Sequence, residues 1–319
     1  MEVHQLRYFC AVAHHGTFTR ASEAEHVAQP SLSQQILKLE AELGARLFDR
    51  LPRSAKLTVF GRAFLPKAER ILRELEEARS ELRDMSGKEK GDLVVGFIPT
   101  IAAYLLPKLL NEFTARHPLI GIKIVEDITP TLLQRLHEGT LDFAVAALPI
   151  AGSEFVIQEL FEEKFYAVLP EKHRLASRSV LSLDELNREP FLLLKEGHCF
   201  RDSLIAACNK LKMSPSVVFE SGQFATILGM VSAGMGVSAV PAMAVQPRTG
   251  CTFIPISGKH STRVVGIVTS RHHYQSRAQR LLMKRMREAC ADFRSTSRPQ
   301  NAGRRKDSGN EAATAETAA

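Results

Sequence analysis

The sequence VAQPSLSQQILKLEAELG, residues 27–44, decides the fold of the first part of this chain. Its apolar residues recur at the spacing of one helix face, at Leu32, Ile36, Leu39 and Leu43. We therefore expect a helix over residues 31–43 with that face turned inward. Pro30 suits the first turn of this helix, and Gly44 suits its end.

Two shorter helical patterns precede this stretch. Residues 4–15 place Leu6, Phe9, Cys10 and Ala13 on one face, which predicts a helix with Cys10 in the core. Thr17 can cap a second helix that carries Arg20, Ala21 and Ala24, and the chain breaks at residues 26–29. The order is that of a helix-turn-helix.

The polar face of the third helix predicts contact with DNA. Short donors and acceptors of this kind meet base edges and phosphates in a major groove. The expected DNA-facing residues are Gln29, Pro30, Ser31, Ser33, Gln34, Gln35 and Lys38. Residues 47–58 predict a short β-wing on which Arg50, Arg53 and Lys56 suit phosphate contact. Taken alone, the wing could equally be a solvated surface turn.

The motif V-A-Q-P-S-L-S-Q-Q-I-x-K-L-E-x-E-L-G-x-x-L-F-D-R, residues 27–50, resembles the N-terminal domain of LysR-type transcriptional regulators. The resemblance implies a winged helix-turn-helix domain over residues 1–58 that binds promoter DNA. It also implies recruitment of RNA polymerase by an activator, and assembly as a homodimer or homotetramer.

Residues 59–90 predict a long linker helix that ends in a hinge. Thr58 can cap the helix, and an apolar stripe continues to Leu82 among alternating charges. Because an isolated helix of this length is exposed on all sides, we expect a coiled-coil contact with a second copy. Residues 86–91 have the composition of a hinge.

From residue 91 the pattern changes to alternating strands and helices, which predicts an α/β domain. The family resemblance implies a two-lobed effector domain, related in fold to periplasmic binding proteins, over residues 91–294. The first lobe is expected at about 91–162 and 267–294, and the second at about 163–266. Residues 295–319 are rich in Ser, Thr, Ala and Glu and predict a disordered tail.

The chemistry-bearing stretch is Gly197-His198-Cys199-Phe200-Arg201-Asp202, followed by Cys208. A thiol at the start of a helix over residues 202–212, between His198 and Arg201, is expected to have its thiolate favoured. Nine helical residues turn through about 900° and rise about 13 Å, whereas a disulfide needs Cα atoms within about 7 Å. Cys199 and Cys208 can therefore join only if the segment unwinds. Both could equally be inert, buried cysteines.

Three motifs resemble the hydrogen-peroxide-sensing members of the LysR family: Gly96–Thr100, Tyr104–Pro107 and Glu196–Asp202 with Cys208. The resemblance implies that Cys199 is the peroxidatic thiol, that Cys208 resolves it in a reversible disulfide, and that a thiol reductant system restores both. It also implies a peroxide pocket, formed by Thr100, Thr129, His198, Arg201 and Arg263. Hydroxyl and imidazole groups suit that task because a peroxide oxygen gains charge as it leaves.

Other functions stay open at this point. A LysR-type regulator with inert cysteines would respond to a small-molecule co-inducer. A thiol peroxidase or cysteine–histidine hydrolase would need neither the helix-turn-helix nor the linker, so we do not expect an enzyme. Cys199, Cys208 and His198 lack the spacing of metal ligands, so no metal and no cofactor is expected.

The composition sets the outer bounds. The 319 residues are 45% hydrophobic and 24% charged, as in soluble globular proteins, and the net charge of +7 permits an anionic partner such as DNA. We expect no export signal and no membrane contact. Five cysteines without an export signal indicate a reducing cytoplasm. Cys251 and Cys290 have no predicted role.

Overall fold

The computed structural model describes residues 1–51, 54–85, 90–258 and 260–296. The N-terminal part holds α1 (Val3–His15), α2 (Phe18–Ala24), α3 (Gln29–Leu43) and a hairpin of β1 (Phe48–Leu51) and β2 (Ser54–Leu57). The Arg20 N–H donates to Thr17 Oγ1 over 3.2 Å at the start of α2, and Gly44 ends α3 with φ of +65°. The predicted helix-turn-helix and wing are confirmed.

The core of this part joins the three helices to the wing. It includes Leu6, Phe9, Cys10, Leu32, Ile36, Leu39 and Phe48. The carboxylate of buried Glu40 accepts the Leu47 N–H over 2.7 Å and the Phe48 N–H over 3.1 Å, which fixes the wing to α3. Leu43 was expected inward but is 38% exposed, because it is the last helical residue before Gly44.

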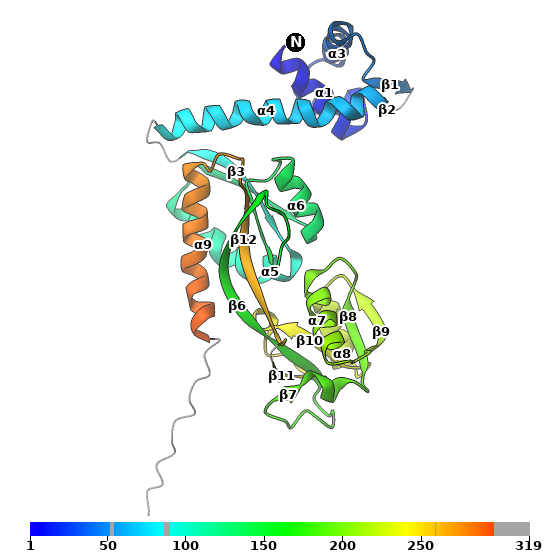
Figure 1. Ribbon diagram of the computed structural model, residues 1–319, viewed down its shortest axis with the longest axis vertical. Helices are drawn as coiled ribbons and strands as arrows, with labels where there is room; N and C mark the ends of the chain where they lie inside the picture. Colours follow the sequence, from blue (N-terminus) through cyan, green and yellow to red (C-terminus); the bar gives the residue numbers. More distant parts are fainter. Residues whose placement is uncertain (52–53, 86–89, 259, 297–319) are drawn as a thin grey trace, which may run out of the picture.

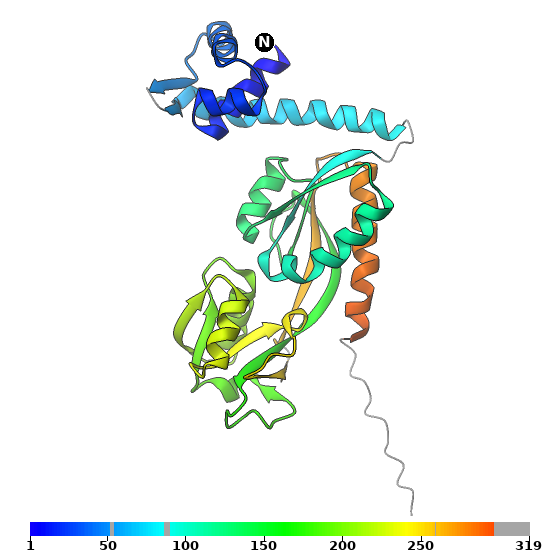
Figure 2. The ribbon, with the colours of Figure 1, turned by 180° about the vertical axis from the view of Figure 1, so that it is seen from behind.

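The linker helix α4 (Val59–Met85) begins where the Gly61 N–H donates to Thr58 Oγ1 over 3.0 Å, as a cap should. It runs from the helix-turn-helix across the end of the effector domain in both views (Figures 1 and 2). Near its end Asp84 accepts the Tyr274 hydroxyl over 2.9 Å and pairs with Arg280 at 3.4 Å. The predicted hinge falls mostly outside the described residues.

The first lobe has helices packed on a mixed sheet, part of which is parallel. Its chain order is β3 (Gly91–Phe97), α5 (Pro99–Arg116), β4 (Ile120–Glu126), α6 (Thr129–His137) and β5 (Phe143–Ala147), and α9 (Arg277–Thr296) returns to it at the end. Strand β3 pairs in parallel with β4 and β5. Helix α9 packs along this lobe (Figure 1). Beyond Thr296, the predicted disordered tail lies outside the described residues.

The second lobe carries most of the short elements. These are β7 (Leu181–Ser182), the 3₁₀ turn η1 (Leu183–Leu186), β8 (Pro190–Leu194), α7 (Cys199–Lys210), β9 (Ser216–Ser221), α8 (Phe224–Ser232), β10 (Ser238–Pro241), the 3₁₀ turn η2 (Ala242–Ala244) and β11 (Cys251–Ser257). Strands β8 and β9 pair in parallel, while β10 and β11 pair with β6.

Two long antiparallel strands, β6 (Phe155–Pro170) and β12 (Thr262–Ser270), pass from one lobe into the other (Figure 1). The core of the first lobe includes Phe161 and Val265, whereas Phe165 belongs to the core of the second. Val265 of β12 pairs with Ala147 of the first lobe, so β12 has entered this lobe by Val265. The sequence predicted the return to the first lobe only at about residue 267. The two lobes therefore meet around residues 161–165 and at the start of β12.

Candidate functional site

Helix α7 begins at Cys199 rather than at Asp202 and ends at Lys210 rather than at residue 212. Gly197 supplies a φ of +88° in the turn before it, a conformation that other residues adopt only with strain. The Asp202 N–H then donates to the His198 carbonyl over 3.2 Å, which closes the first turn. Cys199 is thus the first helical residue.

The two cysteines of α7 belong to different lobes. Cys199 is partly buried and packs against the core of the first lobe. Cys208 is fully buried in the core of the second lobe. None of the five cysteines, all of which lie in the described ranges, forms a disulfide. Because one unbroken helix carries both residues, their separation is about 13 Å along its axis.

The pKa of the Cys199 thiol is raised, chiefly by burial. The Arg263 guanidinium, the Ala147 backbone N–H and the Thr129 hydroxyl each lower this pKa, while Asp202 raises it slightly. The sequence predicted a thiolate favoured by the helix start, His198 and Arg201, so that prediction is wrong on balance. Burial outweighs the helix start, and the cation that opposes it is Arg263.

Arg263 is the centre of a buried polar cluster at the junction of the lobes. Its guanidinium donates to Thr100 Oγ1 over 2.8 Å and to the Thr100 carbonyl over 3.3 Å. It pairs with Glu163 at 2.7 Å and lies 5.3 Å from the centre of the Phe200 ring. The structure therefore brings together two of the residues predicted for the peroxide pocket, Thr100 and Arg263.

Arg201 is held on the side of the second lobe. Its guanidinium donates to the Leu194 carbonyl over 2.9 Å and to the Glu220 carboxylate. It also lies 3.9 Å from a carboxylate oxygen of Glu196. These contacts fasten the first turn of α7 to β8 and β9, so Arg201 supports the helix rather than the thiol.

Two polar atoms beside Cys199 are buried without an ordinary hydrogen bond among the described residues: Thr129 Oγ1 and His198 Nδ1. The Thr129 hydroxyl still lies near enough to the sulfur to lower its pKa. Burial lowers the pKa of His198, which favours the neutral imidazole. Buried polar groups normally find a partner, so this corner could hold a water molecule or a small polar ligand.

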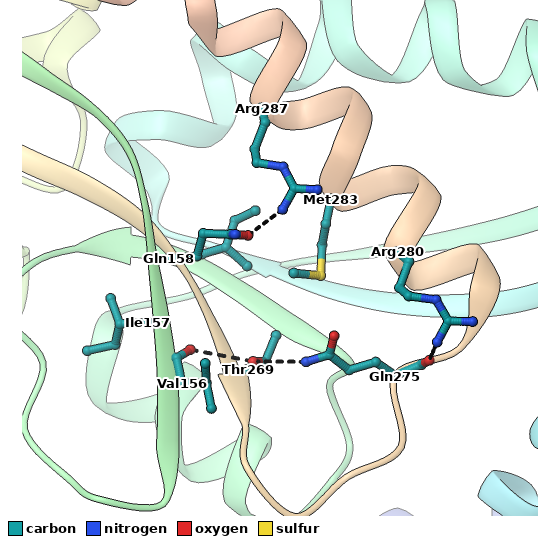
Figure 3. A pocket seen from close by; sticks show the side chains of 9 residues that line it. Val156, Ile157, Gln158, Thr269, Gln275, Arg280, Met283 and Arg287 are labelled. Carbon is teal, nitrogen blue, oxygen red and sulfur yellow. Dashed lines mark hydrogen bonds between the residues drawn. The ribbon is translucent and has the colours of Figure 1, made fainter.

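A cavity of about 270 Å³ opens between the lobes next to this corner. Thr100, Tyr104 and Glu126 line it from the first lobe, and Leu194, Gln223 and Phe224 from the second. A second hollow, of about 390 Å³, lies on the first lobe between β6, β12 and α9 (Figure 3). Arg287 of α9 reaches across it to Gln158 Oε1 over 2.6 Å. None of the predicted site residues lines the second hollow.

The polar face of α3 is turned outward, as DNA contact requires. Gln29, Pro30, Ser31, Gln34 and Lys38 are exposed, and Ser33 and Gln35 are partly exposed. The amide oxygen of Gln35 accepts from Gln5 over 3.2 Å. In the wing, Lys56 is exposed on β2 and Arg50 lies in β1, while Arg53 lies outside the described residues.

Neither a metal centre nor a membrane span was found in the described ranges. No three His, Cys, Asp or Glu side chains of residues 1–51, 54–85, 90–258 and 260–296 gather so as to hold a metal ion. No helix in the same ranges combines the length and apolar character that crossing a bilayer requires.

Two family models match the chain. The model of the bacterial regulatory helix-turn-helix protein, lysR family, matches residues 3–62, and that of the LysR substrate binding domain matches residues 86–291. The chain belongs to the LysR family of bacterial transcription regulators. The expected fold, with its helix-turn-helix and α/β effector domain, is thereby confirmed.

Similar members of the LysR family include OxyR of Escherichia coli K12, a DNA-binding transcriptional dual regulator. It is 33% identical over 271 residues, which cover 84% of this chain and 89% of OxyR. YybE of Bacillus subtilis, an uncharacterised regulator, is 32% identical over 267 residues, 84% of this chain and 91% of YybE. A variant of full-length OxyR from Pseudomonas aeruginosa has a similar structure, with 31% identity, a TM-score of 0.75 and coverage of 95% and 99%.

Sequence reasoning missed Glu163, the acidic partner of Arg263. A signal for it was present, because Phe161, Glu163 and Phe165 alternate in β6 and therefore lie on the same buried face of the strand. A charged residue on an apolar face indicates a buried partner. In this LysR-family chain the partner is Arg263, which lies opposite Glu163 on β12.

Proposed function

We propose that this LysR-family regulator senses hydrogen peroxide through a reversible disulfide between Cys199 and Cys208. One observation carries the proposal: a single helix holds one thiol against the first lobe, beside Arg263 and Thr129, and the other in the core of the second lobe. The similarity to OxyR, in chains of related length, supports the same assignment.

The first step is oxidation of Cys199. Its thiolate attacks one peroxide oxygen, so an S–O bond forms, the O–O bond breaks, and hydroxide leaves and takes up a proton as water. Arg263 stabilises the thiolate, and the hydroxyls of Thr100 and Thr129 and the His198 imidazole donate to the peroxide oxygens; the contact of Arg263 with Thr100 and the buried atoms Thr129 Oγ1 and His198 Nδ1 support this role. The product is a sulfenic acid at Cys199.

The second step forms the disulfide. The Cys208 thiolate attacks the Cys199 sulfur, so an S–S bond forms, the S–O bond breaks and a second water leaves. Helix α7 must unwind for this step, because its geometry keeps the two sulfurs too far apart. Cys208 also has to leave the core of the second lobe, so the disulfide state has a different arrangement of residues 199–208.

The rearranged segment changes the contact between copies in a homodimer or homotetramer, and the linker helices pass this change to the DNA-binding domains. Residues 1–58 bind promoter DNA through α3 and the wing, residues 59–90 link and dimerise, and residues 91–294 sense. RNA polymerase is recruited in the oxidised state, and a thiol reductant of the cytoplasm resets the switch. The role is regulatory rather than enzymatic.

The test compares DNA contact before and after oxidation. DNA sites are selected from a random-sequence pool with the reduced protein and then footprinted with and without a near-stoichiometric dose of peroxide. We expect peroxide to alter the wild-type footprint and to leave that of Cys199→Ser unchanged. Cys251→Ser, which alters another buried thiol of the second lobe, is expected to behave as wild type. A normal response of Cys199→Ser contradicts the proposal.

A second candidate function rests on the cavity between the lobes. Its volume of about 270 Å³ suits a small molecule, and Thr100, Glu126 and Gln223 offer polar contacts within it. In that case a co-inducer binds between the lobes and the cysteines are inert. A footprint that responds to small metabolites in Cys199→Ser and ignores peroxide in the wild type favours this function.

A further inference from the structure

Glu163 is a buried acidic residue that the chemistry described above does not use. Glu163 is 3% exposed and lies on β6 where that strand passes between the lobes. A buried carboxylate is costly unless a charge and hydrogen bonds compensate it. The contacts of the Glu163 carboxylate therefore show which groups compensate its charge.

One carboxylate oxygen of Glu163 contacts Arg263. Glu163 Oε1 accepts from Arg263 Nε over 2.8 Å and lies 2.7 Å from Nη2. Two donors of the guanidinium therefore share one acceptor, which holds this edge of Arg263 against β6. The remaining nitrogen, Nη1, is then directed to Thr100 Oγ1 at 2.8 Å.

The other oxygen ties the pair to the second lobe. Glu163 Oε2 accepts the Met243 N–H of η2 over 3.0 Å. The carboxylate therefore joins β6, β12 and η2, and through Arg263 it reaches α5 at Thr100. Arg263 also lies 5.3 Å from the centre of the ring of Phe200, the residue that follows Cys199 in α7, and it lowers the pKa of the Cys199 thiol.

We propose that Glu163 is a positioning residue for Cys199: it aims Arg263 and, by neutralising that cation, limits how strongly Arg263 activates the thiol. An unopposed arginine beside Cys199 would hold more of it as thiolate and make it react with weaker oxidants. Glu163 thus sets the threshold of the sensor. This inference rests on the proposed role of Cys199 as the sensing thiol.

The test is the pH dependence of Cys199 alkylation in full-length Glu163→Gln. Glutamine keeps an oxygen for Arg263 but removes the negative charge. Iodoacetamide labelling of the Cys199 peptide is followed by mass spectrometry between pH 6 and 10. We expect the midpoint of the rate profile to move to lower pH by roughly half a unit to one unit. Labelling near neutral pH should therefore be about three to ten times faster, because the rate follows the thiolate fraction.

Controls separate this role from a general loss of structure. Glu171→Gln removes a carboxylate directly after the same strand, which accepts the Gly250 N–H over 2.8 Å, and should leave the profile unchanged. A lower melting temperature of Glu163→Gln with an unchanged profile overturns the proposal, because a merely structural residue would give that result. A shift to higher pH overturns it as well.

The pair Arg263→Gln and Arg263→Gln/Glu163→Gln keeps the test decisive if the single Glu163 variant does not fold. Replacing both partners by neutral residues leaves no unpaired buried charge. It therefore destabilises the fold less than removing one partner alone. Arg263→Gln should move the profile to higher pH, and the double variant should bring it back towards wild type. A double variant that matches Arg263→Gln contradicts the role of Glu163.

The alkylation test is separate from the proposed function because it contains no peroxide. If Glu163→Gln shifts the profile and peroxide still fails to oxidise Cys199, the peroxide assignment fails while the role of Glu163 in controlling the thiol stands. If peroxide oxidises Cys199 and the profile does not move, only the inference on Glu163 fails.

Discussion

The two ends of helix α7 place the same side chain in opposite surroundings. Cys199, at the first position, packs against the first lobe and has Arg263, the Ala147 N–H and the Thr129 hydroxyl to favour its thiolate. Cys208, on the last turns, is fully buried in the second lobe, and burial raises its pKa to about 11. Cys199 therefore has groups beside it that favour its thiolate, whereas Cys208 is shielded from solvent.

This difference gives the order of events in the proposed switch. A fully buried thiol cannot meet peroxide first, so Cys199, which is only partly buried, is oxidised and Cys208 follows once α7 unwinds. The barrier to the second step is then the packing of α7 against the second lobe. That packing can be altered separately from the chemistry at Cys199.

The largest expected effect is the contrast in labelling of the two thiols. In the native, reduced protein, iodoacetamide should modify Cys199 at least about 1000 times faster than Cys208. Exposing Cys208 requires a local opening, which at about 4 kcal/mol accounts for three powers of ten. Mass spectrometry of the two peptides measures both rates. The difference in rate should vanish in about 8 M urea, which unfolds the protein. Similar native rates would remove the basis of the comparison.

Loosening α7 should speed the second step. Leu204 is 1% exposed in the core of the second lobe, and Leu204→Ala should lower the free energy of unfolding by about 2–5 kcal/mol. Cys208 labelling and disulfide formation should both accelerate, with little change in Cys199 labelling. Leu211→Ala is the control, because Leu211 is 45% exposed just after the helix. Unchanged disulfide formation in Leu204→Ala would show that helix packing does not limit the step.

The raised pKa of Cys208 predicts a pH dependence of stability. Its pKa is about 11 in the folded protein, against an ordinary value of 9.0, so folding favours the protonated thiol. This contribution is complete below pH 9 and is lost as the pH rises towards 11. The wild type should lose about 2 kcal/mol more than Cys208→Ala over that range, at 1.36 kcal/mol per pKa unit. Denaturant titrations at several pH values measure the free energy of unfolding of both proteins. An equal loss of stability with rising pH in the wild type and in Cys208→Ala would contradict the prediction.

The smallest expected effect concerns a single hydroxyl. Thr129→Val removes the buried hydroxyl beside Cys199 and should slow peroxide oxidation by about tenfold, which is about 1.4 kcal/mol in the barrier. Thr114→Val is a matched control, because that hydroxyl donates to the Leu110 carbonyl on an exposed part of α5. Stopped-flow mixing with peroxide measures both. Equal slowing in the two variants would point to a general effect on folding.

The helices were the part of the fold that sequence periodicity predicted best. The caps at Thr17 and Thr58 and the ending at Gly44 lie where local chemistry places them. The pairing of β6 with β11 and β12 was not predicted, because these strands have partners far away in the sequence. Crossing strands of this kind leave only a weak local pattern.

The candidate site shows the same limit. Cys199 and Cys208 stood out by their spacing, but the cation beside the thiol could not be inferred from its neighbours. Arg201 is adjacent in sequence and bonds Glu220, whereas Arg263 arrives from another strand. Local sequence gives the reactive atom, and the tertiary fold decides its electrostatics.

The most direct test of the central claim is non-reducing peptide mapping after a brief, near-stoichiometric dose of hydrogen peroxide. The account predicts a linked peptide pair that joins Cys199 to Cys208 and that a dithiol separates again. Cys10, Cys251 and Cys290 should form no disulfide, since all three are buried and none shares helix α7 with Cys199. Two unlinked thiols at Cys199 and Cys208 after peroxide has been consumed would contradict the switch and direct attention to ligands between the lobes.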